Sequence, residues 1–214
     1  MQFVSKLQIM KVYFQIMSDD NRSNHEDEIF KSSIKAINMN INIDDKNEFL
    51  SKIKTLKAGD RVYLSGTLLT ARDAVHKELK NLIDNNEKLP YNFVNSIIYY
   101  AGPTDTPPEK VVGSIGPTTS QRMDSYAEYM KKLGVLAVIG KGERSDECKK
   151  IYLRDGITYF IATGGCGALL SKCVTSCEVV AFSHFGCESV KKLTVDNFPV
   201  TVCYDNEQGD IFNG

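Results

Sequence analysis

The sequence lacks several features that would assign it to a broad class of protein. Basic residues are not in excess: the formal net charge is −1 at pH 7, so nucleic acid is not an expected partner. No stretch approaches the roughly 18 consecutive apolar residues of a membrane span. Polar residues interrupt the apolar residues of 1–17 and no small-residue cleavage site follows them, so a secretory signal is not expected. The alternative is a weak organellar presequence, although residues 1–17 contain no arginine. We therefore expect a cytoplasmic protein that binds neither nucleic acid nor a membrane.

The sequence also lacks a Cys-x-x-Cys motif. Its cysteines stand at positions 148, 166, 173, 177, 187 and 203. Disulfides are not expected in a chain without an export signal. A metal or iron–sulfur site needs three or four convergent ligands, and these spacings do not indicate one. We expect small buried thiols and no metal bound by this chain alone.

The composition is that of a globular protein, with 42% hydrophobic and 25% charged residues in 214 positions. Residues 18–28 are polar and have no periodicity, which is typical of a linker. We therefore expect residues 1–33 to be a poorly ordered extension and linker, and residues 34–214 to form one domain.

Apolar runs bounded by turn residues alternate with amphipathic stretches along the chain. Strands are expected at 34–43, 61–69, 96–101, 135–139, 157–162, 178–183 and 199–204. Helices are expected at 46–56 after the cap Asp44-Asp45, at 70–83, 124–133 and 146–154, and in a short segment up to 172, with an amphipathic stretch at 186–193. This alternation predicts an α/β fold.

The loop Gly113–Met123 (GSIGPTTSQRM) is the most informative stretch of the sequence. Thr118, Thr119 or Ser120 could cap the helix that follows, and a helix N-terminus favours an anion. Arg122 adds a planar fork suited to a carboxylate or phosphate. The alternative is a capped helix with a solvent-facing arginine.

A second candidate site follows the strand 61–69. Thr70 could cap the next helix, and Arg72 and His76 are four residues apart, so they share a helix face. That face could bind an anion, with His76 as a proton carrier; the alternative is a surface pair. Lys141 also follows an expected strand. Three cations at strand ends, with little matching acid, suit a small dianion.

Four motifs together resemble a known family. They are Ser65–Lys77 (SGTLLTARDAVHK), Tyr100–Pro103 (YAGP), Gly113–Asp124 and Ile139–Gly142 (IGKG). In this order they resemble the β subunit of iron–sulfur hydro-lyases, the class I fumarases and L-tartrate dehydratases. The resemblance implies a three-layer β/β/α swivelling domain. The alternation alone would equally suit a doubly wound sheet.

The resemblance also implies an activity, the reversible addition of water to the double bond of a dicarboxylate. It places Arg72, Thr118, Thr119, Arg122 and Lys141 around the substrate. Thr118 matches the proposed proton-abstracting base, and His76 is a rival. A [4Fe–4S] cluster would be held by a partner α subunit in a hetero-oligomer, expected as α2β2.

Three functions remain in view at this point. The sequence around Pro107–Ser114 favours a fumarate hydratase β chain. The alternatives are an L(+)-tartrate dehydratase β subunit and a standalone dicarboxylate-binding module without catalysis.

Overall fold

The computed structural model describes residues 38–205, 207 and 209–212. The extension and linker predicted for residues 1–33 lie outside the described residues, as does the start of the strand predicted at 34–43. The boundary between 33 and 34 therefore stays a prediction.

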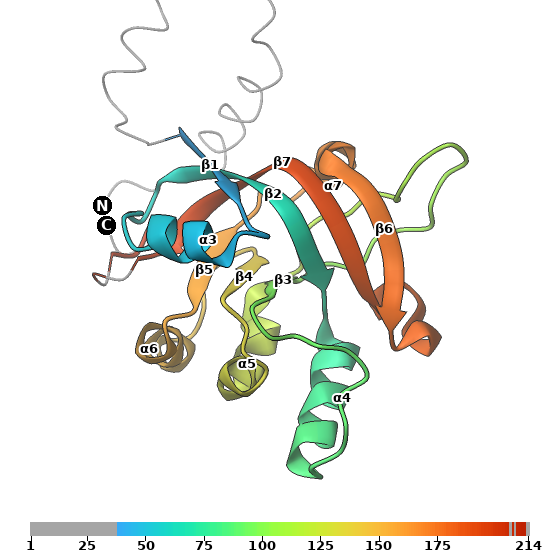
Figure 1. Cartoon of the computed structure of the whole chain (residues 1–214), viewed down its shortest axis with the longest axis horizontal. Coiled ribbons are helices and arrows are strands. Elements are labelled where there is room, and N and C mark those ends of the chain that lie inside the picture. Colours follow the sequence, from blue (N-terminus) through green and yellow to red (C-terminus); the bar gives the residue numbers. More distant parts are fainter. Residues whose placement is uncertain (1–37, 206, 208, 213–214) are drawn as a thin grey trace, which may run out of the picture. The chain divides into compact units, whose positions relative to one another are not determined.

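Seven strands form one sheet that closes on itself (Figure 1). They are β1 (Asn38–Asn42), β2 (Arg61–Thr70), β3 (Ile97–Tyr99), β4 (Ala137–Gly140), β5 (Thr158–Ile161), β6 (Val174–Ala181) and β7 (Val190–Tyr204). The strands β1 to β5 pair in parallel in chain order. Strand β7 runs antiparallel to both β5 and β2, so β2, β3, β4, β5 and β7 form a closed mixed barrel. Strand β6 adds to β7 as an edge strand.

The long strands β2 and β7 hold the barrel together. Alternate residues of both strands are buried, as expected for strands with one face toward a core. Their pairing shifts register between Leu64 and Gly66. Gly66 has φ +129°, and a Cβ there would lie 2.8 Å from Ile43, so this bulge requires glycine.

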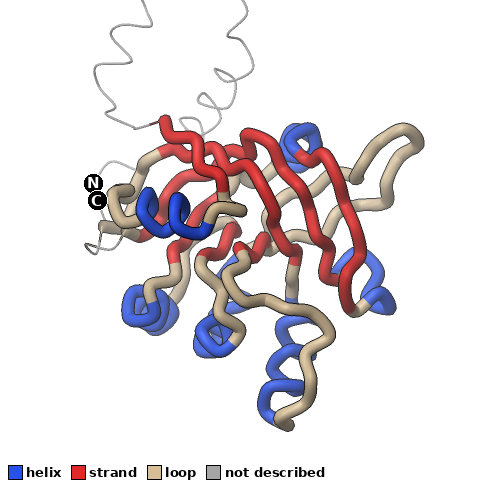
Figure 2. Tube along the Cα trace, viewed as in Figure 1, coloured by secondary structure: helices blue, strands red, loops and turns tan. Residues whose placement is uncertain are grey.

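The helices are short and connect the strands (Figure 2). The α-helices are α3 (Lys46–Ile53), α4 (Asp73–Asp84), α5 (Ala127–Lys132), α6 (Asp146–Asp155) and α7 (Gly167–Leu170), and the 3-10 helices are η1 (Ser120–Tyr126), η2 (Ser171–Cys173) and η3 (Ser183–Glu188). Helices α4, α5 and α6 gather on one side of the strands (Figure 1). None of the helices in the described part is long and apolar enough to cross a membrane.

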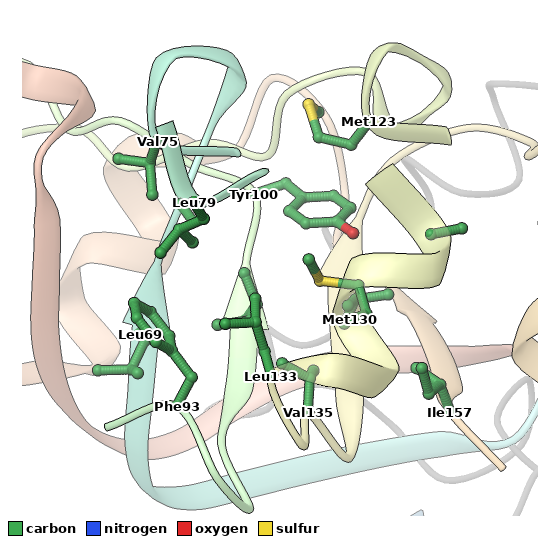
Figure 3. Close-up of a cluster of buried hydrophobic side chains, with 14 of the residues drawn as sticks. Leu69, Val75, Leu79, Phe93, Tyr100, Met123, Met130, Leu133, Val135 and Ile157 are labelled. Carbon is green, nitrogen blue, oxygen red and sulfur yellow. The ribbon is translucent and has the colours of Figure 1, made fainter. Parts of the chain in front are cut away.

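A buried apolar cluster lies between these helices and the strands. Val75 and Leu79 of α4 face Tyr100, Met123 and Met130 across it (Figure 3). Met123 lies on η1, directly after Arg122. The core therefore fixes the backbone of the loop that carries the candidate site.

The α/β fold is confirmed, and the closed ring of strands excludes an open doubly wound sheet. The three-layer swivelling arrangement stays a prediction. Two local expectations are wrong. The helix expected at 124–133 begins as a 3-10 helix at Ser120, and the amphipathic stretch 186–193 is divided between the end of the 3-10 helix η3 and the start of strand β7. Val190 and Leu193 are buried there because they lie in β7, which pairs with β2 and β6.

Candidate active site

The loop Gly113–Asp124 is fastened to the ends of β3 and β4. The amide N–H of Thr118 donates to the carbonyl of Tyr100 at 2.7 Å, and that of Ser120 donates to Lys141 at 3.1 Å. Isolated bridges pair Thr119 with Lys141 and Pro117 with Ala101. The loop thus lies at the carboxyl ends of parallel strands, where ligand sites of α/β sheets gather.

Ser120 points into the protein. It is fully buried, and its Oγ accepts from the N–H of Lys141 at 3.0 Å and lies 3.0 Å from the hydroxyl of Tyr159. A Cβ at Gly140 would lie 1.8 Å from this Oγ, so the close approach requires glycine. Ser120 therefore anchors the loop and leaves Thr118 and Thr119 more exposed.

The expectation that a hydroxyl side chain caps the following helix is wrong. Thr119 occupies the N-cap position of η1, but its side chain makes no capping bond. Thr118 Oγ1 instead accepts a short hydrogen bond from the guanidinium of Arg122. The first turn is 3-10, and the hydroxyls of Thr118 and Ser120 bind side-chain or backbone groups in place of the free N–H groups of the helix.

Asp73 lies between two of the predicted cations. Its Oδ2 is 3.2 Å from Nη2 of Arg122 and 4.0 Å from Nε of Arg72. A chain of contacts therefore runs from Thr118 through Arg122 and Asp73 to Arg72, so residues 50 positions apart in the sequence form one patch.

Arg72 is held on its other side by the last residue of η3, Glu188. Its Nη2 lies 3.4 Å from Oε1 of Glu188, and a Cβ at Gly102 would come within 3.0 Å of Nη1. The second oxygen of Glu188 accepts from the N–H of Ala74 at 3.1 Å. The expectation of little matching acid is therefore wrong, because Asp73 and Glu188 both face the cations.

Thr70 does not cap α4, contrary to expectation. It is the last residue of β2, and its buried hydroxyl donates to the carbonyl of Ser189 at 3.1 Å. The same oxygen accepts from the N–H of Lys191 at 2.9 Å. Helix α4 begins at Asp73, and Glu188 supplies the capping oxygen from another part of the chain.

His76 is buried, with 2% of its surface exposed, so the surface-pair alternative is wrong for this residue. Its Nδ1 lies 2.8 Å from the carbonyl oxygen of Arg72. A carbonyl only accepts, so Nδ1 carries the proton. The ring packs against Tyr100 and Tyr126, and Nε2 has no hydrogen-bond partner in the described structure. Burial lowers the pKa of His76 to about 4.

Lys141 directly follows β4 and is half-buried. Its side chain runs beside Gly164, where a Cβ would lie 3.3 Å from Cδ. No carboxylate of the described residues forms an ion pair with its ammonium group. Lys141 is thus the site cation that is most available to an anion.

The cysteines are free, and no group of three His, Cys, Asp or Glu side chains in the described part of the chain could hold a metal ion. Cys148 and Cys203 are buried, as expected, and burial raises the pKa of Cys148 to about 12. Cys187 is exposed, so the expectation of buried thiols is wrong there.

A family model described as "Fumarase C-terminus" matches residues 12–214. The chain belongs to this family. The fumarase C-terminal chain is 41% identical over 166 residues to the "Putative L(+)-tartrate dehydratase subunit beta" of Methanocaldococcus jannaschii, which covers 75% of this chain and 85% of the relative.

The family includes longer relatives. Identity is 38% over 157 residues with "Fumarate hydratase 2" of Leishmania major, covering 72% of this chain and 28% of the relative. It is 34% over 180 residues with "Fumarate hydratase class I, aerobic" of Escherichia coli K12, covering 83% and 33%. This fumarase C-terminal chain therefore spans about a third of the fumarate hydratases that it matches.

Proposed function

We propose that this chain is the β subunit of a [4Fe–4S]-dependent hydro-lyase that interconverts fumarate and L-malate. The observation that carries the proposal is the contact chain from Thr118 through Arg122 and Asp73 to Arg72, in a member of the fumarase C-terminal family. Lys141 joins it through its backbone pairing with Thr119. Cations and hydroxyls in one patch suit a small dicarboxylate.

The cations of the patch bind the substrate carboxylates. Arg72, Arg122 and Lys141 provide the positive charge, and Thr118 and Thr119 provide hydroxyl groups. A charge-assisted contact contributes about 1.5–3 kcal/mol when water is excluded. Their spread along one loop and two strand ends suits a ligand with an anionic group at each end.

Thr118 is the proposed base. A guanidinium that donates to a hydroxyl oxygen stabilises the deprotonated form of that hydroxyl, and Arg122 makes this contact with Thr118. His76 is the weaker candidate because its protonated nitrogen is used by the carbonyl of Arg72 and its other nitrogen is buried.

The cluster would be held by a partner α subunit, in an assembly proposed as α2β2. The side chains present here are oxygen and nitrogen donors suited to carboxylates, and no thiolate set converges among the described residues. When bound, the cluster acts as a Lewis acid on the substrate hydroxyl. One relative is itself named a β subunit, which supports a separate partner.

A tartrate dehydratase β subunit is the second candidate. It is favoured by the match to 85% of the length of a putative tartrate dehydratase β subunit. The two functions differ in the substrate consumed, so rates on fumarate and L(+)-tartrate separate them.

The test is to co-express the full chain with the cluster-bearing α chain of the same organism and to measure hydration of fumarate. Arg122→Ala should lower kcat/KM at least ~100-fold, because a buried carboxylate would lose its partner. Arg154→Ala is the matched control, since Arg154 is an exposed arginine paired with Glu128 outside the site. Thr118→Ala compared with His76→Asn decides between the two bases.

Two results would contradict the proposal. One is full activity of the chain without iron or a partner. The other is tight fumarate binding by the lone chain in calorimetry with no turnover in the complex, which would indicate a standalone binding module.

A further inference from the structure

A buried ion pair lies immediately behind the candidate site. Nε of Arg144 is 2.5 Å from Oδ1 of Asp124, and the other carboxylate oxygen accepts from the N–H of Ser145 at 2.7 Å. The Arg144 side chain is completely buried and that of Asp124 is 12% exposed. Asp124 stands two residues after Arg122, so this pair ties the end of the site loop to the segment that follows β4.

Arg144 is enclosed by three tyrosine rings. Its guanidinium carbon lies 4.9 Å from the ring centre of Tyr152, 5.3 Å from that of Tyr159 and 5.4 Å from that of Tyr100. Two of these tyrosines anchor the site loop. The carbonyl of Tyr100 accepts from Thr118, and the hydroxyl of Tyr159 lies 3.0 Å from Ser120. One buried side chain thus contacts the residues that anchor the loop at Thr118, at Ser120 and at its end, Asp124.

This arrangement is a poor way to stabilise a core. Nη1 and Nη2 of Arg144 have no hydrogen-bond partner in the described structure, and an unpaired buried donor is costly. Replacing a buried ion pair by apolar groups often leaves a protein as stable as before. An ion pair, unlike an apolar contact, fixes the relative orientation of its two groups. Here it orients Asp124 relative to the segment that carries Lys141.

We propose that Arg144 is a positioning residue that sets the place of Thr118 and Arg122 relative to Lys141. It acts through its ion pair with Asp124 at the end of the loop. It also acts through its contacts with Tyr100 and Tyr159, which bind Thr118 and Ser120. It does not touch the substrate. The identity of the ligand rests on the proposed hydro-lyase function. The effect of Arg144 on the position of the loop does not depend on that function.

The test compares a neutralised pair with a matched control pair. Arg144→Met with Asp124→Asn removes both charges, and the asparagine oxygen still accepts from Ser145. The control is Arg154→Met with Glu128→Gln, which removes the exposed pair between α5 and α6. Arg144→Lys keeps the positive charge without the fork. Asp124→Asn alone is the milder change if the double variant does not fold.

Two measurements are made on each protein. Hydrogen–deuterium exchange of the full chain alone should show faster exchange, by about tenfold or more, at the amides of Thr118 and Ser120, with β2 and β7 unchanged. In the complex with the α chain, kcat/KM for fumarate should fall by ~100-fold, as expected for a site displaced by about 1 Å. The control pair should change neither quantity, and Arg144→Lys should restore part of both.

Each outcome decides the question. Unchanged exchange in the loop overturns the inference. So does exchange that rises equally in β2 and β7, because the pair would then support the whole core. If the wild-type complex does not hydrate fumarate, the proposed function fails, but the exchange measurement still tests the positioning role.

Discussion

Lowering the pH from 7 to 5 should destabilise this chain through His76. The pKa of an ordinary histidine is 6.5, and burial lowers that of His76 to about 4 in the folded protein. Between these values the unfolded state binds a proton that the folded state does not. Stability therefore rises with pH through this window and falls as the pH drops toward 4.

The magnitude follows from the difference between the two pKa values. At about 1.4 kcal/mol per unit, 2.5 units give about 3 kcal/mol in total, of which about 2 kcal/mol is lost between pH 7 and pH 5. This is a large fraction of the stability of a domain of this size.

The assay is urea unfolding of the full chain at pH 7, 6 and 5, compared with His76→Asn. An asparagine amide can donate to the carbonyl of Arg72 in place of Nδ1, but it does not titrate. The variant should therefore lack about 2 kcal/mol of the pH-dependent loss. Other pH-dependent contributions to stability are common to both proteins and cancel in the comparison. If both proteins lose the same stability, His76 of the folded chain takes up its proton at the usual pH, which would refute the argument from its burial.

Three further predictions concern Gly140, the cysteines and Glu188, and only the last needs the partner chain. Gly140→Ala should destabilise the chain by about 1–3 kcal/mol in urea unfolding, because its Cβ would meet Ser120 Oγ at 1.8 Å; wild-type stability would contradict the anchoring role of Ser120. Iodoacetamide at pH 8 should label Cys187 and spare Cys148 and Cys203 in the native chain, as read by peptide mass spectrometry, since only Cys187 is exposed; early labelling of Cys148 would count against its burial. Glu188→Gln should lower KM for the dicarboxylate in the complex because Arg72 would lose a competing carboxylate while Ala74 keeps its acceptor; a raised KM would mean that Glu188 holds Arg72 in its productive position.

Local chemistry explains which elements the sequence predicts correctly. Asp45 caps α3 by accepting from Glu48, and Ser145 caps α6 by accepting from Cys148. Both bonds join residues three positions apart, so the signal lies within a few letters of sequence. Strands β3, β4 and β5 lie in apolar runs that end at turn residues, and they and β2 occur where the sequence predicts them.

Long-range contacts explain the rest. Nothing near Thr70 indicates that its hydroxyl binds Ser189 and Lys191, or that Glu188 caps α4 from more than a hundred residues away. Ser120 looks like Thr118 and Thr119 in the sequence, yet it points inward because Gly140 leaves room for it. The pairing of Asp124 with Arg144 depends on the parallel order of β3 and β4, which a single sequence does not state.

The charges of the site bear on how a bound dicarboxylate would be compensated. The patch holds three cations, Arg72, Arg122 and Lys141, and two carboxylates, Asp73 and Glu188, so it carries 3 − 2 = +1. A bound dicarboxylate would bring the total to −1. An uncompensated charge in a closed site is costly, so either one carboxylate turns away when the substrate binds or the partner supplies a cation. Titration of fumarate into the lone chain and into the complex tests whether tight binding depends on the partner, which would contribute both the cluster and any such cation.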